Sequence, residues 1–111
     1  MSGTKTRLLI KLVIGRALLD TAESGHRFEL EEAGRGWTIT VYGMSAADAA
    51  FIGDNIGQLN FFHFVTALDE SAAIQKYWLY DLDEPLFRYD RATGTAVFEL
   101  DSKVAYTNER V

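Results

Sequence analysis

Two histidines, His26 and His63, are the side chains that titrate near neutral pH in this sequence of 111 residues. General acid–base catalysis recruits histidine most often, because its ordinary pKa lies near physiological pH. His63 lies between Phe62 and Phe64, and on a strand its ring would point to the face opposite those two rings. We interpret His63 as a half-buried structural residue, and a small enzyme or ligand carrier built on it remains an alternative. His26 is interpreted as a solvated residue at the start of a strand.

The residue types of several common active sites are absent or lie in the wrong context. The chain has no cysteine, which excludes disulfides, thiolate nucleophiles, iron–sulfur clusters and the common structural zinc sites. No serine lies in a G-x-S-x-G or S-x-x-K motif, and residues 53–57 lack the lysine of a phosphate-binding loop. We therefore expect no cofactor and no metal, and we favour a protein that is not an enzyme.

The segment from residue 77 to residue 90 interleaves aromatic residues with four acids. Tyrosine and tryptophan dominate the energetics of protein interfaces, and acidic neighbours would steer a basic partner to them. A calcium loop is disfavoured, because Pro85 interrupts the alternating acids that such a loop requires. The alternative is an ordinary antiparallel sheet with buried aromatics and solvated acids. The candidate partner-binding residues are Tyr77, Trp78, Tyr80, Asp81, Asp83, Glu84 and Tyr89.

Gly53 and Gly57 lie one turn apart in a predicted helix, in series with Ala49. Glycine inside a helix costs about 1 kcal/mol relative to alanine, so two glycines on one edge indicate that another backbone packs closely there. That neighbour is either the protein's own sheet or another subunit. Gly53 and Gly57 are therefore the candidate contact of a homo-oligomer.

The net charge of −5 is unevenly distributed along the chain. Lys5, Arg7, Lys11 and Arg16 lie in a start without acids, whereas residues 17–111 carry seven bases and sixteen acids. An acidic body repels phosphate and anionic lipid, so we expect neither nucleic acid nor membrane as a partner. The basic start could bind an acidic partner or the acidic body of another copy. The simpler interpretation is a charged rim on a strand edge.

Alternation of apolar and polar residues with period two is the clearest structural signal. Two hairpins are predicted: residues 26–31 with 37–42 around Gly34 and Gly36, and residues 86–90 with 95–100 around Thr93 and Gly94. Single strands are predicted at residues 61–65, 77–82 and 104–106. Residues 69–76 fit either a short helix or a loop.

Two segments decide the fold class. The apolar run at residues 7–14 favours a central strand, and a buried helix continuing through Ala22 is the competing interpretation. Ser45 is a suitable N-cap for a helix at residues 46–59 that is apolar along one side. We predict an α+β fold, a mostly antiparallel sheet of five to seven strands with that one main helix packed on one face.

The whole chain, residues 1–111, is predicted to form one cytoplasmic domain, with residues 1–5 and the last few residues loose. The favoured function is a small acidic protein that contacts a protein with a basic surface, as an inhibitor, an immunity protein or a phage-encoded antagonist does. An assembly subunit of a homo-oligomer or phage particle is the first alternative, and the enzyme or carrier using His63 is the second.

Overall fold

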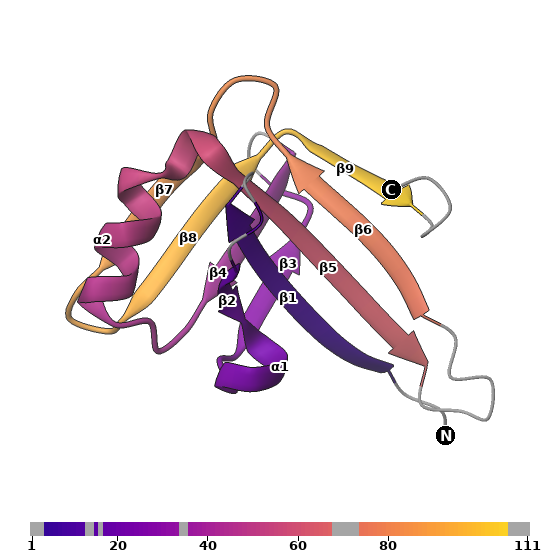
Figure 1. The fold of residues 1–111 in the computed structure, drawn as a ribbon, viewed down its shortest axis with the longest axis horizontal. Helices are drawn as coiled ribbons and strands as arrows, with labels where there is room; N and C mark the ends of the chain where they lie inside the picture. Colours follow the sequence, from indigo (N-terminus) through magenta and orange to yellow (C-terminus); the bar gives the residue numbers. More distant parts are fainter. Residues whose placement is uncertain (1–3, 13–14, 16, 34–35, 68–73, 107–111) are drawn as a thin grey trace.

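The computed structural model describes residues 4–12, 15, 17–33, 36–67 and 74–106. Within these residues, nine strands form two antiparallel sheets (Figure 1). The strands are β1 (Thr4–Leu12), β2 (Ala17–Asp20), β3 (Phe28–Glu31), β4 (Trp37–Val41), β5 (Leu59–Ala67), β6 (Ile74–Tyr80), β7 (Leu86–Asp90), β8 (Thr95–Leu100) and β9 (Ser102–Tyr106). The first sheet has the order β2-β1-β5-β6-β9, and the second has the order β3-β4-β8-β7.

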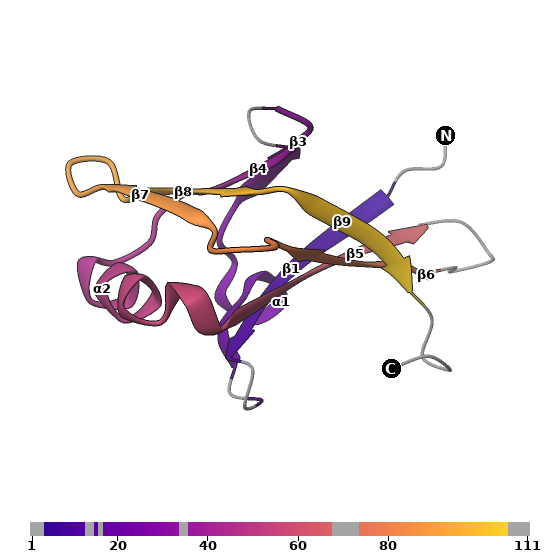
Figure 2. The same ribbon diagram turned by 90° about the horizontal axis from the view of Figure 1, so that it is seen from above.

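The prediction of one sheet with five to seven strands is wrong, because the strands divide between two layers (Figure 2). The division occurs at Asp101, a bend between β8 of the four-stranded sheet and β9 of the five-stranded sheet. Strands that switch sheets at a bend in this way form the corners of packed sheets. The strand interpretation of residues 7–14 is confirmed for residues 7–12, since β1 lies between β2 and β5 and pairs with β5 over its whole length; residues 13 and 14 lie outside the described residues.

The main helix is shorter than predicted. Helix α2 spans Ala46–Asp54 and is followed by a 3-10 turn, Ile56–Gln58, so residues 46–59 do not form one helix. Ser45 caps the start as expected, because its Oγ accepts a hydrogen bond of 3.1 Å from the backbone N–H of Asp48. The helix ends because Leu59 already belongs to β5, where its side chain is buried in the core. A second helix, α1 (Thr21–Ser24), is a single turn.

The core lies between the inner faces of the two sheets, and α2 packs beneath β7 and β8 at one end (Figures 1 and 2). Phe61 of β5 and Phe98 of β8 join the sheets edge to face, with ring centroids 5.1 Å apart. Phe87 of β7 stacks on Phe98 at 4.9 Å. The buried apolar residues form one cluster: Leu8, Ile10, Leu12, Leu19, Ile39, Val41, Met44, Ala49, Ile52, Leu59, Phe61, Leu79, Ala96, Phe98 and Leu100.

Both predicted hairpins are present. In the first, β3 pairs with β4, and Ala33 and Gly36 exchange backbone hydrogen bonds at its turn end. A Cβ at Gly36 would lie 2.9 Å from the carbonyl oxygen of Asp101, so the chain requires glycine where this hairpin meets the corner. In the second, Gly94 has a φ of +72° and closes the turn between β7 and β8.

The prediction of loose chain ends is wrong for residues 4 and 5, which begin β1. Residues 1–3 and 107–111 lie outside the described residues. The predicted strand at residues 104–106 is confirmed within β9, and of residues 69–76 the described part, residues 74–76, is strand. No helix in the described part of the chain has the length and apolar character needed to cross a membrane.

Candidate functional site

The five-stranded sheet has a second apolar face, directed away from the core. Because side chains alternate along a strand, the odd residues of β1 and the even residues of β5, β6 and β9 share this face. Its central row pairs Leu9, Phe62, Trp78 and Val104 across four neighbouring strands. We call this surface the open face and define it by Lys5, Arg7, Leu9, Lys11, Phe62, Phe64, Ile74, Lys76, Trp78, Tyr80 and Val104.

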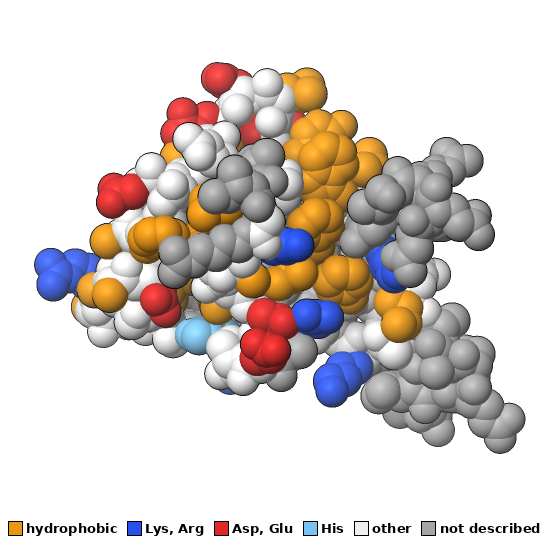
Figure 3. Space-filling model, in the orientation of Figure 1, with side chains coloured by type: hydrophobic (Ala, Val, Ile, Leu, Met, Phe, Trp, Pro, Cys, Tyr) orange, Lys and Arg blue, Asp and Glu red, His pale blue; other side chains and the backbone are white. Residues whose placement is uncertain are grey.

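Large apolar side chains of the open face are exposed to solvent. The exposed fraction is 37 % for Trp78, 40 % for Val104 and 53 % for Ile74. Trp78 is fixed in place, since its ring lies 4.5 Å from that of Tyr80 and its Nε1 donates to Asn60 Oδ1 at 3.3 Å. Figure 3 shows hydrophobic side chains (orange) running across this side of the molecule. Contiguous apolar surface with an ordered tryptophan is typical of protein interfaces.

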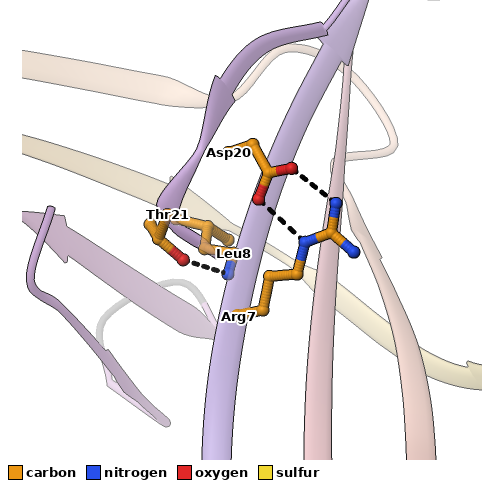
Figure 4. A network of polar contacts seen from close by, with 4 residues as sticks. All are labelled: Arg7, Leu8, Asp20 and Thr21. Atoms are coloured by element: carbon orange, nitrogen blue, oxygen red, sulfur yellow. Dashed lines mark hydrogen bonds and ion pairs between the residues drawn. The ribbon is translucent and has the colours of Figure 1, made fainter. Parts of the chain in front are cut away.

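One end of the open face is basic. Arg7 makes a two-pronged ion pair with Asp20, with Nε at 2.8 Å and a terminal nitrogen at 2.5 Å (Figure 4). The hydrogen bonds that Arg7 donates to Asp20 raise the pKa of Arg7 above its ordinary value. The guanidinium also lies 5.3 Å from the centre of the Phe64 ring. A hollow of about 500 Å³ opens here, lined by Lys5, Arg7, Phe64, Thr66, Ile74 and Lys76.

Two adjacent residues, Asp20 and Thr21, hold β1 in place at the basic end of the open face. Thr21 is buried, and its Oγ1 accepts a hydrogen bond of 2.9 Å from the backbone N–H of Leu8 (Figure 4). Asp20 and Thr21 are adjacent, so one short segment holds both the backbone of β1 and the guanidinium of Arg7. The position of Arg7 on the open face is therefore fixed by two separate contacts.

The opposite end of the open face is acidic. The chain leaves β6 at Tyr80 and enters a loop with Leu82, Asp83 and Glu84, whose side chains are all exposed. Leu82 is 81 % exposed, more than any other large hydrophobic residue in the described chain. In Figure 3 some acidic side chains (red) lie near the top of this view, around this loop, and others lie lower down, beside Lys and Arg side chains (blue).

Asp81 has a structural role at the acidic end of the open face. Its carboxylate accepts hydrogen bonds of 3.1 Å from the backbone N–H groups of Asp101 and Asp83. Asp101 returns the contact, because its carboxylate accepts from the backbone N–H of Leu82 at 3.1 Å and 3.2 Å. The two aspartates therefore join the loop to the corner between β8 and β9.

Removing this link is expected to weaken the fold. We expect Asp81→Ala to lower the free energy of unfolding by about 1 to 2 kcal/mol, because two backbone N–H groups lose a charged acceptor. Urea unfolding would measure the change. The matched control is Asp83→Ala, which removes an exposed carboxylate two residues away and should change the stability by less than about 0.5 kcal/mol. Equal losses in the two variants would contradict this role for Asp81.

The structure divides the seven candidate partner-binding residues among several places. Trp78 and Tyr80 lie on the open face, and Asp83 and Glu84 lie in the loop at its acidic end. Tyr77 is on the inner face, where its ring stacks on that of His63. Tyr89 of β7 donates its hydroxyl to the carbonyl oxygen of Met44 at 2.6 Å. Asp81 holds the corner, as described above.

The sequence analysis did not find most of the open face. Leu9, Phe62, Phe64 and Val104 were assigned no role, and Lys5, Arg7 and Lys11 were interpreted as a strand-edge rim. One signal was present, because Phe62 and Phe64 make β5 apolar on both alternating faces. Strands of that kind normally have both faces covered. Which face is left uncovered follows only from the three-dimensional pairing.

The two glycines proposed as an oligomer contact lie in different surroundings. Gly53 is half-buried in α2, and a Cβ there would lie 3.2 Å from the Phe87 ring of the protein's own sheet. Gly57 is exposed in the 3-10 turn, and a Cβ would meet nothing within 4 Å. Packing against Phe87 accounts for Gly53 within one chain, and an oligomer contact at these glycines stays a prediction.

His63 points into the core, on the face opposite Phe62 and Phe64 as predicted. It is 8 % exposed and lies between the Phe28 ring at 5.7 Å and the Tyr77 ring at 6.0 Å. Its Nδ1 is buried and has no hydrogen-bond partner. Burial, helped by the positive charge of Lys103, lowers the pKa of His63 to about 4. The ring is therefore neutral at pH 7 and packs as a core residue.

His26 joins two loops near the surface. Its Nε2 lies 3.1 Å from the carbonyl oxygen of Gly43, and its Nδ1 lies 2.6 Å from Ser24 Oγ. A carbonyl only accepts, so Nε2 carries the proton and the Ser24 hydroxyl donates to Nδ1. The contact between His26 and Ser24 lies within one turn, whereas the contact between His26 and Gly43 joins that turn to the chain after β4. We interpret both contacts as structural.

The described residues contain no group of three or more His, Asp or Glu side chains that could hold a metal ion. Comparison of the chain with models of protein families, with curated proteins and with solved structures gave no match in any of the three.

Proposed function

We propose that this chain acts through contact with another protein, without catalysis, and that the open face is the surface of contact. The observation that carries the proposal is the apolar row Leu9, Phe62, Trp78 and Val104 across four strands, in which Trp78 and Val104 are exposed and Leu9 and Phe62 are half-buried. Burying apolar surface stabilises by roughly 25 cal/mol per Å², so a partly exposed row of this kind favours association. Trp78, Tyr80 and Arg7 are also the residue types that contribute most at interfaces.

A nucleic-acid platform is the nearest competing function, because bases stack on aromatic side chains beside basic groups. Two observations favour protein. Arg7 is already paired with Asp20, and Asp83 and Glu84 lie at the other end of the same face, where they would repel phosphates. The aliphatic members of the face, Leu9, Ile74 and Val104, add contact area without a stacking surface.

Photo-cross-linking in the host cell tests the proposal. A photoreactive residue at Val104, on the open face, is expected to give covalent protein adducts at least several times more abundant than the same residue at Glu31. Glu31 is the matched control, because it is exposed on β3 of the other sheet. Equal yields at the two positions, or adducts with nucleic acid alone, would contradict the proposal.

A further inference from the structure

The geometry points to a second copy of this chain as the partner of the open face. In this arrangement two open faces stack, and each copy places Leu82 and its acidic neighbours over the basic hollow of the other. This inference rests on the proposed function, and it names the partner. Its basis is that each end of the face complements the other end in both shape and charge.

The two ends have complementary shapes. The hollow at the basic end has Phe64 and Ile74 among its lining residues, and Ile74 is more than half exposed. The loop at the acidic end presents Leu82, whose side chain is almost fully exposed. In a two-fold dimer, the projecting apolar side chain of one copy can fill the apolar hollow of the other copy. The reverse contact then forms at the same time.

The spacing along β6 allows both contacts to form at once. Ile74 precedes Trp78 by four residues, and Leu82 follows it by four. At about 3.3 Å per residue, Ile74 lies roughly 13 Å from Trp78 at one end of β6, and Leu82 lies two residues beyond Tyr80, at the other end of the strand. A two-fold axis that passes by Trp78, parallel to the sheet and perpendicular to the strands, therefore places Leu82 of each copy over the hollow of the other.

The charges match in the same arrangement. Lys5 and Lys76 border the hollow beside the Arg7–Asp20 ion pair, and Asp83 and Glu84 follow Leu82 in the loop. The two-fold axis exchanges the ends of the face, so each basic end meets an acidic end. The alternative axis, parallel to the strands, would stack like charges and is disfavoured by several kcal/mol. Charge therefore selects the antiparallel arrangement of the two faces.

The area of the face is adequate for such a contact. The seven residues of β6 and four strands give a patch of roughly 23 Å by 19 Å, or about 440 Å² in projection. The accessible area of a corrugated surface is larger than its projection. It therefore approaches the roughly 800 Å² that one partner contributes to a standard interface. The basic hollow and the acidic loop belong to one chain, so a second copy complements both. A purely acidic partner would be repelled by Asp83 and Glu84.

Charge reversal followed by mixing tests the arrangement. Multi-angle light scattering across a dilution series is expected to give twice the chain mass for the wild type. The variants Lys5→Glu/Lys76→Glu and Asp83→Lys/Glu84→Lys are each expected to raise the dimer dissociation constant by about 100-fold or more, because like charges then meet at both ends. An equimolar mixture of the two variants is expected to recover the dimer, because opposite charges meet again at both ends.

Recovery on mixing separates an interface from a folding defect, since two misfolded variants would not restore each other. The matched control is Glu31→Lys/Asp54→Lys, which reverses two exposed acids away from the open face and should leave the dimer intact. A monomeric wild type, higher polymers, or a mixture that stays monomeric would overturn the proposal. If a monomeric wild type still cross-links other proteins through Val104, only the second copy is wrong. If Val104 gives no protein adducts, the proposed function itself fails.

Discussion

Replacing Phe61 by alanine is expected to lower the free energy of unfolding by about 3 to 5 kcal/mol. Phe61 is fully buried on the inner face of β5, and its ring meets that of Phe98 from the other sheet. The substitution therefore removes a large side chain from the contact between the two layers. Neither sheet can close the resulting cavity without shifting as a whole. The expected loss in the free energy of unfolding is therefore at the upper end of the range for core substitutions.

Phe62→Ala is the matched control for this prediction. Phe62 is the next residue of the same strand, so the same side chain is removed, but from the open face. Below the concentration at which the proposed dimer would form, its loss should lower the free energy of unfolding by less than half as much, because the ring is only half-buried. Chemical denaturation of both variants, followed by far-UV circular dichroism, would compare the two losses. Equal losses would show that the core does not lie where the structure places it.

The local elements of this fold could be predicted because their signals are local. In β3 and β4 apolar and polar residues alternate, and glycines mark the turn, so the hairpin follows from neighbouring residues alone. The hairpin of β7 and β8 follows in the same way from its alternation and Gly94. The end of α2 was misplaced because Ile56 and Leu59 continue the helical pattern, although Leu59 is needed in β5.

The division into two sheets could not be predicted, because it depends on pairings between distant segments. β4 pairs with β8, and β1 pairs with β5, across more than forty intervening positions in each case. Strand registers over such separations are set by packing of the whole core and have no local sequence signature. The bend at Asp101, which separates β8 from β9, reads in the sequence as one more polar residue between strands.

The open face was missed for the same reason. Lys5 and Arg7 are far from Lys76 in the sequence, and they border one hollow only because β1, β5 and β6 pair in that order. The aromatic and acidic segment was found, but alternation divides it, with Trp78 on the open face and Tyr77 on the inner face. Composition identified residues suited to binding, and the pairing of strands decided which of them share a surface.

Acidification is expected to destabilise this protein through His63 at a pH above that at which most carboxylates titrate. The folded-state pKa of His63 is about 4, whereas an unfolded histidine has a pKa of about 6.5. The unfolded chain therefore binds the proton more tightly, and protonation favours unfolding. The stabilising contribution of the neutral ring is complete above pH 6.5, and it is lost as the pH falls from 6.5 towards 4.

The variant His63→Leu isolates this effect, because leucine has a similar volume and no titratable group. From pH 7 to pH 4.5 the wild type should lose about 2 kcal/mol more stability than the variant. The Nδ1 of His63 has no partner to lose, so the variant should fold at pH 7. His26→Gln, which keeps His63, should retain the wild-type slope. Urea unfolding at a series of pH values measures all three chains, and parallel curves for the wild type and His63→Leu would contradict a desolvated imidazole at this position. The positive charge of Lys103 lies near His63 and adds to the penalty on the imidazolium.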